Sequence, residues 1–152
     1  MKKISILLVS MFCLAAGTVK AQDYQTAIGA KFYLGDGTLG GFNIKHSLAE
    51  KSAIEGSLLF ASGAVGLEGL YEFQGPIPGA AGLQYFVGGG GLLAFGTGGG
   101  STSFGLRLTG GAEYTFSGAP INISLGLDPT FYLAPSTGTN LALGLGIRYV
   151  LR

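Results

Sequence analysis

The sequence is poor in charged residues, in histidine and in cysteine. Asp, Glu, Lys and Arg make up 11% of the 152 residues, against roughly 25% in ordinary soluble domains. Cys13 is the only cysteine and His46 the only histidine. A single histidine excludes a metal site built from several histidines, and a single cysteine excludes an internal disulfide.

The first 21 residues have the features of a secretory signal peptide. Two lysines precede an uncharged run over residues 4–16, and Val19-Lys20-Ala21 supplies a cleavage pattern that ends in a small residue. The uncharged run has 13 residues, fewer than the ~20 that a membrane-spanning helix needs. We therefore expect cleavage between Ala21 and Gln22 rather than a membrane anchor.

The mature domain would span residues 22–152 and contain no cysteine, which suits an exported protein that does not rely on disulfides. Cys13 does not indicate a lipoprotein, because Phe12 stands where lipid attachment requires a small residue. Three of the nine basic residues leave with the signal peptide, so the mature domain has six bases, eight acids and a net charge of −2. This balance gives no indication of a nucleic-acid partner.

Long apolar runs are absent from the mature domain, although 47% of the chain is hydrophobic. No stretch approaches the ~18 consecutive apolar residues typical of a spanning helix. Only helices and closed barrels satisfy every backbone hydrogen bond inside a lipid bilayer, so the pattern favours a transmembrane β-barrel. Glycine contributes 29 residues, but aliphatic and aromatic residues recur between the glycines, unlike in a disordered low-complexity chain.

Alternation of large apolar residues with small or polar ones predicts the strands. Clusters of Gly, Pro, Ser and Asn interrupt the alternation and mark the turns. The predicted strands are 24–33, 40–48, 52–60, 64–74, 83–95, 103–116, 121–133 and 141–151. Their lengths are close to the ~9 to 11 residues that a tilted membrane strand requires. Pro129 falls on the apolar face of its strand and is expected to mark a bulge.

The alternation places every charged residue of the strands on the face opposite the large apolar side chains. These charged residues are Lys31, Lys45, Glu55, Glu68, Glu72, Arg107, Glu113, Asp128 and Arg148. The same face is rich in glycine, at Gly29, Gly41, Gly88, Gly90, Gly105, Gly111, Gly126, Gly144 and Gly146. A face of this composition suits the narrow interior of an eight-stranded barrel.

A soluble lipocalin-like barrel would show the same alternation with its apolar face turned inward. The aromatic residues of the apolar face argue against that orientation, because with a periplasmic N-terminus they form two girdles, as on a lipid-facing surface. One girdle comprises Phe32, Phe42, Phe60, Phe95, Phe104 and Phe131, and the other Tyr71, Phe73, Tyr85, Tyr114, Phe116 and Tyr149. Each Lys or Arg facing lipid at mid-depth would cost ~2 to 4 kcal/mol.

The interior of such a barrel is expected to hold an ion-pair network. Four bases would meet five acids there, so that the lumen is nearly neutral and its walls are cross-linked. Arg107 is expected to pair with Glu113 or Glu68. Removing one partner of a buried pair leaves an unpaired charge, which destabilises the fold.

Three segments carry a resemblance to a known family. They are GFNIKHSL (41–48), GLYEFQGPIPGAAGLQYFVGGGG (69–91) and GGAEYTFSGAPINISLGLDPTFYL (110–133). They resemble the small outer-membrane β-barrel proteins of Bacteroidota, related in architecture to OmpA-type and opacity-type membrane domains. The resemblance implies an eight-stranded barrel in the outer membrane and supplies no catalytic residues. One departure is the end of the sequence, Leu151-Arg152, where many such barrels have an aromatic residue.

Three features of the sequence resemble sites that carry chemistry. Residues 35–40 match the spacing G-x-G-x-x-G, but a strand follows them where a phosphate-binding loop needs a helix. His46 is predicted to face lipid near the periplasmic end, with Ser47 inward and no acid beside it, unlike a histidine activated for catalysis. Glu68 and Glu72 are about 13 Å apart along one strand, too far to act as a catalytic pair.

The predicted outer loops, near 34–39, 61–64, 96–102 and 134–140, are short and carry little charge. Residues 96–100 are nearly all glycine and predict a flexible loop rather than a binding motif. Adhesion or receptor binding through large loops is therefore unsupported.

The sequence as a whole predicts an all-β fold, an eight-stranded antiparallel up-and-down transmembrane β-barrel of a Gram-negative outer membrane. We expect a non-enzymatic, structural or envelope-associated protein without a cofactor. Its expected partners are outer-membrane lipids and, during biogenesis, the barrel-assembly machinery. Two alternatives stay open: a narrow porin-like passage for small or apolar solutes, and a lipid-modifying enzyme that depends on His46.

Overall fold

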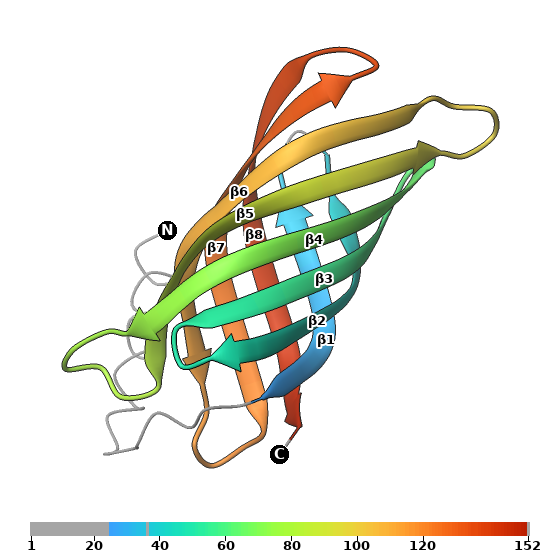
Figure 1. The fold of residues 1–152 in the computed structure, drawn as a ribbon. Coiled ribbons are helices and arrows are strands. Elements are labelled where there is room, and N and C mark those ends of the chain that lie inside the picture. The colour runs from blue at the N-terminus through green and yellow to red at the C-terminus, as the bar shows by residue number, and fades with distance from the viewer. Residues whose placement is uncertain (1–24, 36, 152) are drawn as a thin grey trace, which may run out of the picture.

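The computed structural model describes residues 25–35 and 37–151, which form a closed antiparallel β-barrel of eight strands (Figure 1). Each strand pairs with its neighbours in sequence order, and β8 pairs with β1 to close the sheet. The strands are β1 (Thr26–Leu34), β2 (Leu39–Ala49), β3 (Ser52–Ala61), β4 (Ala64–Pro76), β5 (Leu83–Gly96), β6 (Thr102–Thr115), β7 (Ile121–Ala134) and β8 (Gly138–Leu151). The predicted fold class is confirmed.

No helix among the described residues is long and apolar enough to cross a membrane. The predicted signal peptide, residues 1–21, and its cleavage site at Ala21 and Gln22 lie outside the described residues.

The largest difference from the predicted boundaries is at β8, which begins at Gly138 instead of residue 141. Residues 138–140 are rich in turn-forming types, but they pair with Thr130, Phe131 and Tyr132 of β7. This hairpin continues past the point where β1 stops, because the pairing of β1 with β8 ends at Leu34. Cross-strand pairing therefore overrides the local turn preference of the segment.

The connections between strands lie at two ends of the barrel. The β1–β2, β3–β4, β5–β6 and β7–β8 connections share one end, here called the loop end, and β1 begins at the other, the terminal end (Figure 1). The connection between β3 and β4 has two residues, Ser62 and Gly63, and Gly63 has a φ of 78° that favours glycine. As predicted, a strand and not a helix follows Gly35, since β2 begins at Leu39.

The prediction of a bulge at Pro129 is wrong. The β6–β7 register is the same on both sides of this residue, where Arg107 pairs with Thr130 and Gly110 pairs with Leu127. The two positions in between have no pairs in this ladder, since proline has no N–H to donate. The register shift that these strands do have lies nearer the start of β6.

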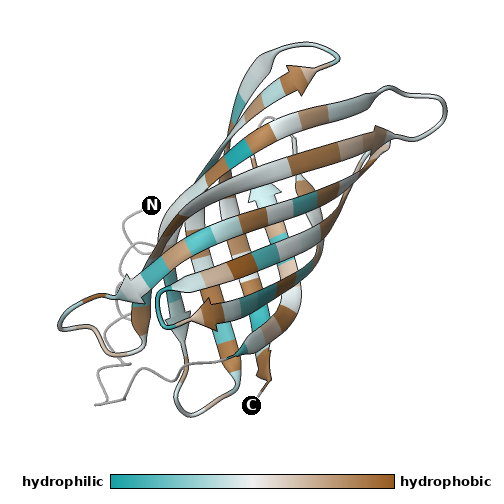
Figure 2. Ribbon diagram, viewed as in Figure 1, coloured by the Kyte–Doolittle hydropathy of each residue, from teal (hydrophilic) through white to brown (hydrophobic). Residues whose placement is uncertain are grey.

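The outer surface of the barrel is apolar and the interior is polar. Phe42 is 70% exposed and Leu141 58% exposed on the outside, and hydropathy alternates along the strands (Figure 2). The interior contains the buried charged side chains. A buried apolar cluster of Tyr33, Leu59, Leu92 and Ala142 lies toward the loop end.

Glycine allows the close approach of strands within the barrel wall. A Cβ added at Gly90 of β5 would overlap the carbonyl oxygen of Gly69 in β4. A Cβ added at Gly69 would meet no atom within 4 Å. Packing therefore requires glycine at the inward position of Gly90 but not at the outward position of Gly69.

Candidate functional site: the charged interior

The structure places all nine predicted interior charges inside the barrel, with between 0% and 6% of each residue exposed. They come from every strand except β5, whose inward positions near mid-height are glycines and Leu92. Successive side chains of a strand point to opposite faces of the sheet. In each of these strands the charged side chains therefore lie on the inner face and the large apolar ones on the outer face. Eight of the nine charges take part in ion pairs among the described residues.

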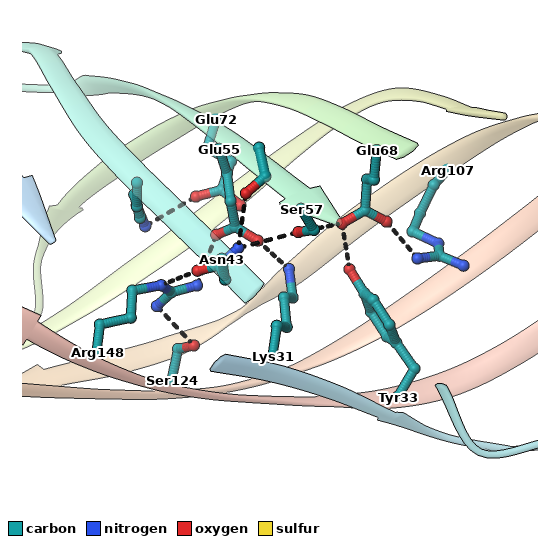
Figure 3. A network of polar contacts seen from close by, with 12 residues as sticks. Lys31, Tyr33, Asn43, Glu55, Ser57, Glu68, Glu72, Arg107, Ser124 and Arg148 are labelled. Carbon is teal, nitrogen blue, oxygen red and sulfur yellow. Dashed lines mark hydrogen bonds and ion pairs between the residues drawn. The ribbon is translucent and has the colours of Figure 1, made fainter. Parts of the chain in front are cut away.

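Glu55 of β3 binds two bases from strands that are not its neighbours in the sheet. Lys31 of β1 contacts one carboxylate oxygen, and an η-nitrogen of Arg148 of β8 lies 2.7 Å from the other (Figure 3). The Arg148 guanidinium also donates to Asn122 and Ser124 of β7, each at 3.0 Å. Hydrogen bonds to a charged group are stronger than those between neutral groups. Arg148 therefore links β8 to both β3 and β7.

Lys45 of β2 lies between two acids. Its ammonium nitrogen is 2.8 Å from Glu113 of β6 and 2.8 Å from Glu72 of β4. Lys45 donates a hydrogen bond to Glu113, and its contact with Glu72 is an ion pair of the same length. Glu113 is also 4.0 Å from Arg148, which connects this group to the Glu55 group.

Arg107 of β6 binds Glu68 of β4, one of its two predicted partners. The other predicted partner, Glu113, is bound by Lys45. Arg107 also donates to Thr130 at 2.7 Å. The pair lies nearer the loop end than the Glu55 group does, beneath the apolar cluster.

Uncharged polar side chains join the two groups of ions into one network. Arg148 donates to Asn43, which donates to Ser57 at 3.0 Å, and Ser57 donates to Glu68 at 3.0 Å (Figure 3). The hydroxyl of Tyr33 donates to the same oxygen of Glu68 at 2.7 Å. Glu68 therefore accepts from a phenol, a serine and a guanidinium.

Charge alone does not identify these uncharged residues among the inward positions of the strands. The available signal was spacing, since Tyr33 is two residues from Lys31, Asn43 two from Lys45, and Ser57 two from Glu55. A two-residue spacing in a strand places both side chains on one face. The omitted residues are Tyr33, Asn43, Ser57, Asn122, Ser124 and Thr130.

Asp128 of β7 is the one predicted network residue that the structure does not bring into an ion pair. It is 1% exposed, and none of the described residues forms a salt bridge with it. It has a side-chain hydrogen bond with Thr109 of β6. The interior thus holds four bases and five acids, and one acid is left over.

The predicted girdle residues lie at the two ends of the outer surface. Ten are exposed, and the other two, Tyr114 and Phe116, are half-buried and pack edge to face at 4.8 Å. The remaining contacts of this kind are Phe42 with Phe60 and Tyr71 with Phe73. Phe116 lies just beyond β6 rather than at its last position.

His46 lies on the outer face of β2 near the terminal end and is half-buried. Its Nδ1 atom is 2.8 Å from the hydroxyl oxygen of Thr26 in β1. Ser47 accepts a hydrogen bond from Gln74 at 3.4 Å and is not joined to His46.

Across residues 25–35 and 37–151, no group of three or more His, Cys, Asp or Glu is arranged to hold a metal ion.

No protein-family model matches this sequence, and no curated protein matches it. Among solved structures, the chain is similar to the N-terminal β-barrel domain of OprF from Pseudomonas aeruginosa. The TM-score is 0.66 at 18% sequence identity, and the match covers 84% of this chain and 100% of the OprF domain. The two proteins share the fold of a closed eight-stranded antiparallel β-barrel.

Proposed function

We propose, starting from the barrel fold shared with the OprF domain, that this chain is a non-enzymatic outer-membrane protein whose interior is closed by its own ion pairs. Its role in the envelope is structural, and acyl chains of the outer membrane contact its outer surface. Membership of a Bacteroidota family stays a prediction. Cleavage of residues 1–21 by signal peptidase is part of the proposal, and the N-terminal residue of the mature protein is then Gln22.

The apolar outer surface supports the membrane location. Ile44, Leu58, Leu67 and Leu93 are all exposed on neighbouring strands between the two aromatic girdles. The pairing of β8 with β1 closes the sheet, and a closed sheet is the condition for crossing a bilayer with β-strands. Aromatic residues at both ends of an apolar band are typical of outer-membrane barrels.

The observation that carries the closed interior is that ion pairs cross the barrel. Lys45 with Glu113 joins β2 to β6, Arg148 with Glu55 joins β8 to β3, and Arg107 with Glu68 joins β6 to β4. These strands are not neighbours in the sheet, so the paired side chains occupy the interior of the barrel. An eight-stranded barrel has an interior only wide enough for such side chains.

A leakage experiment tests this proposal. The mature chain is folded into liposomes loaded with a small fluorescent solute, and release is compared with empty liposomes and with liposomes that contain a known porin. We expect release at the level of the empty liposomes. Steady release through the wild-type chain would refute the closed interior and support the alternative of a narrow passage.

A fractionation experiment tests the location independently. We expect the chain in the outer-membrane fraction, resistant to extraction with high salt, and with a gel mobility that changes on boiling. Recovery of the mature chain as a water-soluble protein without detergent would refute the location, whatever the leakage experiment gives.

A further inference from the structure

The outer surface of the barrel is hollowed by a groove that crosses β2, β3, β4 and β5, which lie side by side in the sheet (Figure 1). Its volume is about 540 Å³, which is within the ~300 to 1,000 Å³ typical of sites for small molecules. Ile44 and Ile54, both exposed on the outer surface, line its sides. We call this hollow the glycine groove, because glycines form its floor.

The floor is formed by Gly56 of β3, Gly69 of β4 and Gly89 of β5. Gly56 and Gly69 pair directly, at outward positions of their strands. A Cβ added at Gly69 would meet no atom within 4 Å, and one added at Gly56 would lie 3.6 Å from Ile44, an ordinary contact. Packing within the barrel therefore does not require the absence of side chains at these two positions.

Other outward glycines are covered by an aromatic ring of the neighbouring strand. A Cβ added at Gly40 would overlap the ring of Phe32, and one added at Gly75 would overlap the ring of Tyr85. Such rings fill the space that a glycine leaves on the face of a sheet. None of the described side chains covers Gly69 in this way, so the glycine groove is open to whatever surrounds the barrel.

The surroundings of the outer surface decide what can fill the groove. Ile44 and Ile54 offer no hydrogen bonds to water, and an unfilled hollow loses the dispersion contacts of the atoms that line it. In the proposed membrane location, acyl chains surround this surface. An acyl chain is narrow and flexible, and it can therefore lie against the exposed backbone of β3 and β4.

Polar side chains line the groove on the side nearest the terminal end. His46 pairs with Ile54, and Ile54 pairs with Tyr71, so the three lie in one row across the sheet. His46 and Tyr71 both border the groove. When Nδ1 of His46 accepts the hydroxyl hydrogen of Thr26, 2.8 Å away, Nε2 carries the ring hydrogen and can donate it. The groove thus combines an apolar floor with hydrogen-bond donors along one side.

We propose that the glycine groove binds one phospholipid, with an acyl chain over Gly56 and Gly69 and the headgroup beside His46 and Tyr71. The acyl chain fills the hollow, and the phosphate or ester oxygens accept hydrogen bonds from the two donors. The inference rests on the proposed membrane location and adds a selected lipid at one part of the wall. Because the donors lie toward the terminal end, this lipid belongs to the periplasmic leaflet in the predicted orientation.

The test maps where a phospholipid stays on the outer surface. The full mature chain is refolded into phosphatidylcholine vesicles that contain a small share of phosphatidylcholine with a photoreactive group in its acyl chain. After illumination, mass spectrometry identifies the labelled strands. We expect labelling of β3 and β4 at least about threefold above that of β7 and β8, a preference of ~0.7 kcal/mol.

A variant that fills the groove locates the effect. Gly69→Leu should lower the labelling of β3 and β4 to the level of β7 and β8. Gly110→Leu is the matched control, since Gly110 is an outward glycine of β6 outside the groove, where an added Cβ would lie 3.9 Å from the nearest atom. Gel mobility before and after boiling shows whether each variant is folded, and Gly56→Leu provides the same comparison if Gly69→Leu does not fold.

A second variant tests the headgroup. His46→Leu keeps the glycine floor but removes the ring N–H, and it should lower the labelling of β3 and β4 without increasing that of β7 and β8. Unchanged labelling in His46→Leu would overturn the contact between His46 and the headgroup.

The outcomes separate this proposal from the membrane location on which it rests. Equal labelling of all strands in the wild type would overturn the groove but support a lipid-facing wall. Labelling of no strand would refute the membrane location itself. A dimer in detergent that Gly69→Leu converts to a monomer would also overturn the proposal, because a second copy of the chain would then occupy the groove.

Discussion

The guanidinium of Arg107 lies 4.1 Å above the centre of the Tyr33 ring, and both side chains bind the carboxylate of Glu68. The three residues belong to β6, β1 and β4. Together they form a stacked unit across the barrel, in which the ring faces one cation and its hydroxyl donates to the acid. Such a unit combines a cation–π contact with charge-assisted hydrogen bonds.

Replacing Arg107 with leucine should destabilise the barrel by ~3 to 5 kcal/mol, because the buried carboxylate of Glu68 loses its counter-charge. Lys51→Leu is the control, since Lys51 is exposed in the β2–β3 turn and should change the free energy of unfolding by at most ~1 kcal/mol. Urea unfolding of both variants in detergent measures the difference. Equal midpoints would show that the buried pair does not stabilise the fold.

Removing the hydroxyl of Tyr33 should have a smaller effect than removing Arg107. Tyr33→Phe keeps the ring beneath the guanidinium but deletes the hydrogen bond to Glu68, so we expect a loss of ~1 to 3 kcal/mol. Tyr71→Phe makes the same chemical change on the outer surface, where Tyr71 is 43% exposed, and should stay within ~0.5 kcal/mol of the wild type. If the two variants unfold at the same urea concentration, the Tyr33 hydroxyl contributes nothing.

Two neighbouring glycines provide a test of packing in the wall. Gly90→Ala should destabilise the barrel by ~1 to 3 kcal/mol, because the new methyl group overlaps the backbone of β4. Gly69→Ala adds the same group to open space and should leave stability within ~0.5 kcal/mol of the wild type. The measurement is the unfolding free energy of each variant in the same detergent. A larger loss at Gly69 than at Gly90 would contradict the register.

A charge placed on the outer surface separates a lipid-facing wall from a wall exposed to water. Leu67 of β4 is 49% exposed on the outer surface between the two girdles, and Leu67→Arg should cost ~2 to 4 kcal/mol in lipid vesicles. In water the same change would replace an exposed apolar group with a polar one and would have little effect on stability. Leu67→Ala controls for the lost side chain. A Leu67→Arg barrel as stable in vesicles as Leu67→Ala would contradict the lipid-facing surface.

The fold could be predicted from the sequence because one rule, alternation of side chains along a strand, applies to every strand. It separated Lys45 from His46 and Glu68 from Leu67 without knowledge of the pairing. The start of β8 could not be predicted, because Gly138 is held in a strand only by its pairing with Tyr132. Local preference carries no information about such a partner.

Alternation along the strands does not show which interior side chains form ion pairs with each other. It places Arg107 and Glu113 on one face of β6 but does not reveal that Arg107 reaches across to β4 while Glu113 is bound from β2. Those choices depend on the stagger of all the strands around the closed sheet. For the same reason the sequence showed an excess of one acid but could not identify Asp128 as the residue left without a base.

Arg148 has an additional consequence for how the barrel reaches its final state. It lies in β8, whose pairing with β1 is the seam that turns an open sheet into a cylinder. Its contacts with Asn43 and Glu55 join strands formed from distant parts of the chain, and distant contacts of this kind form slowly. Glu55 therefore gains Arg148 as its second cationic partner only when β8 pairs with β1. The last ion pairs of the interior and the closure of the sheet form in the same step.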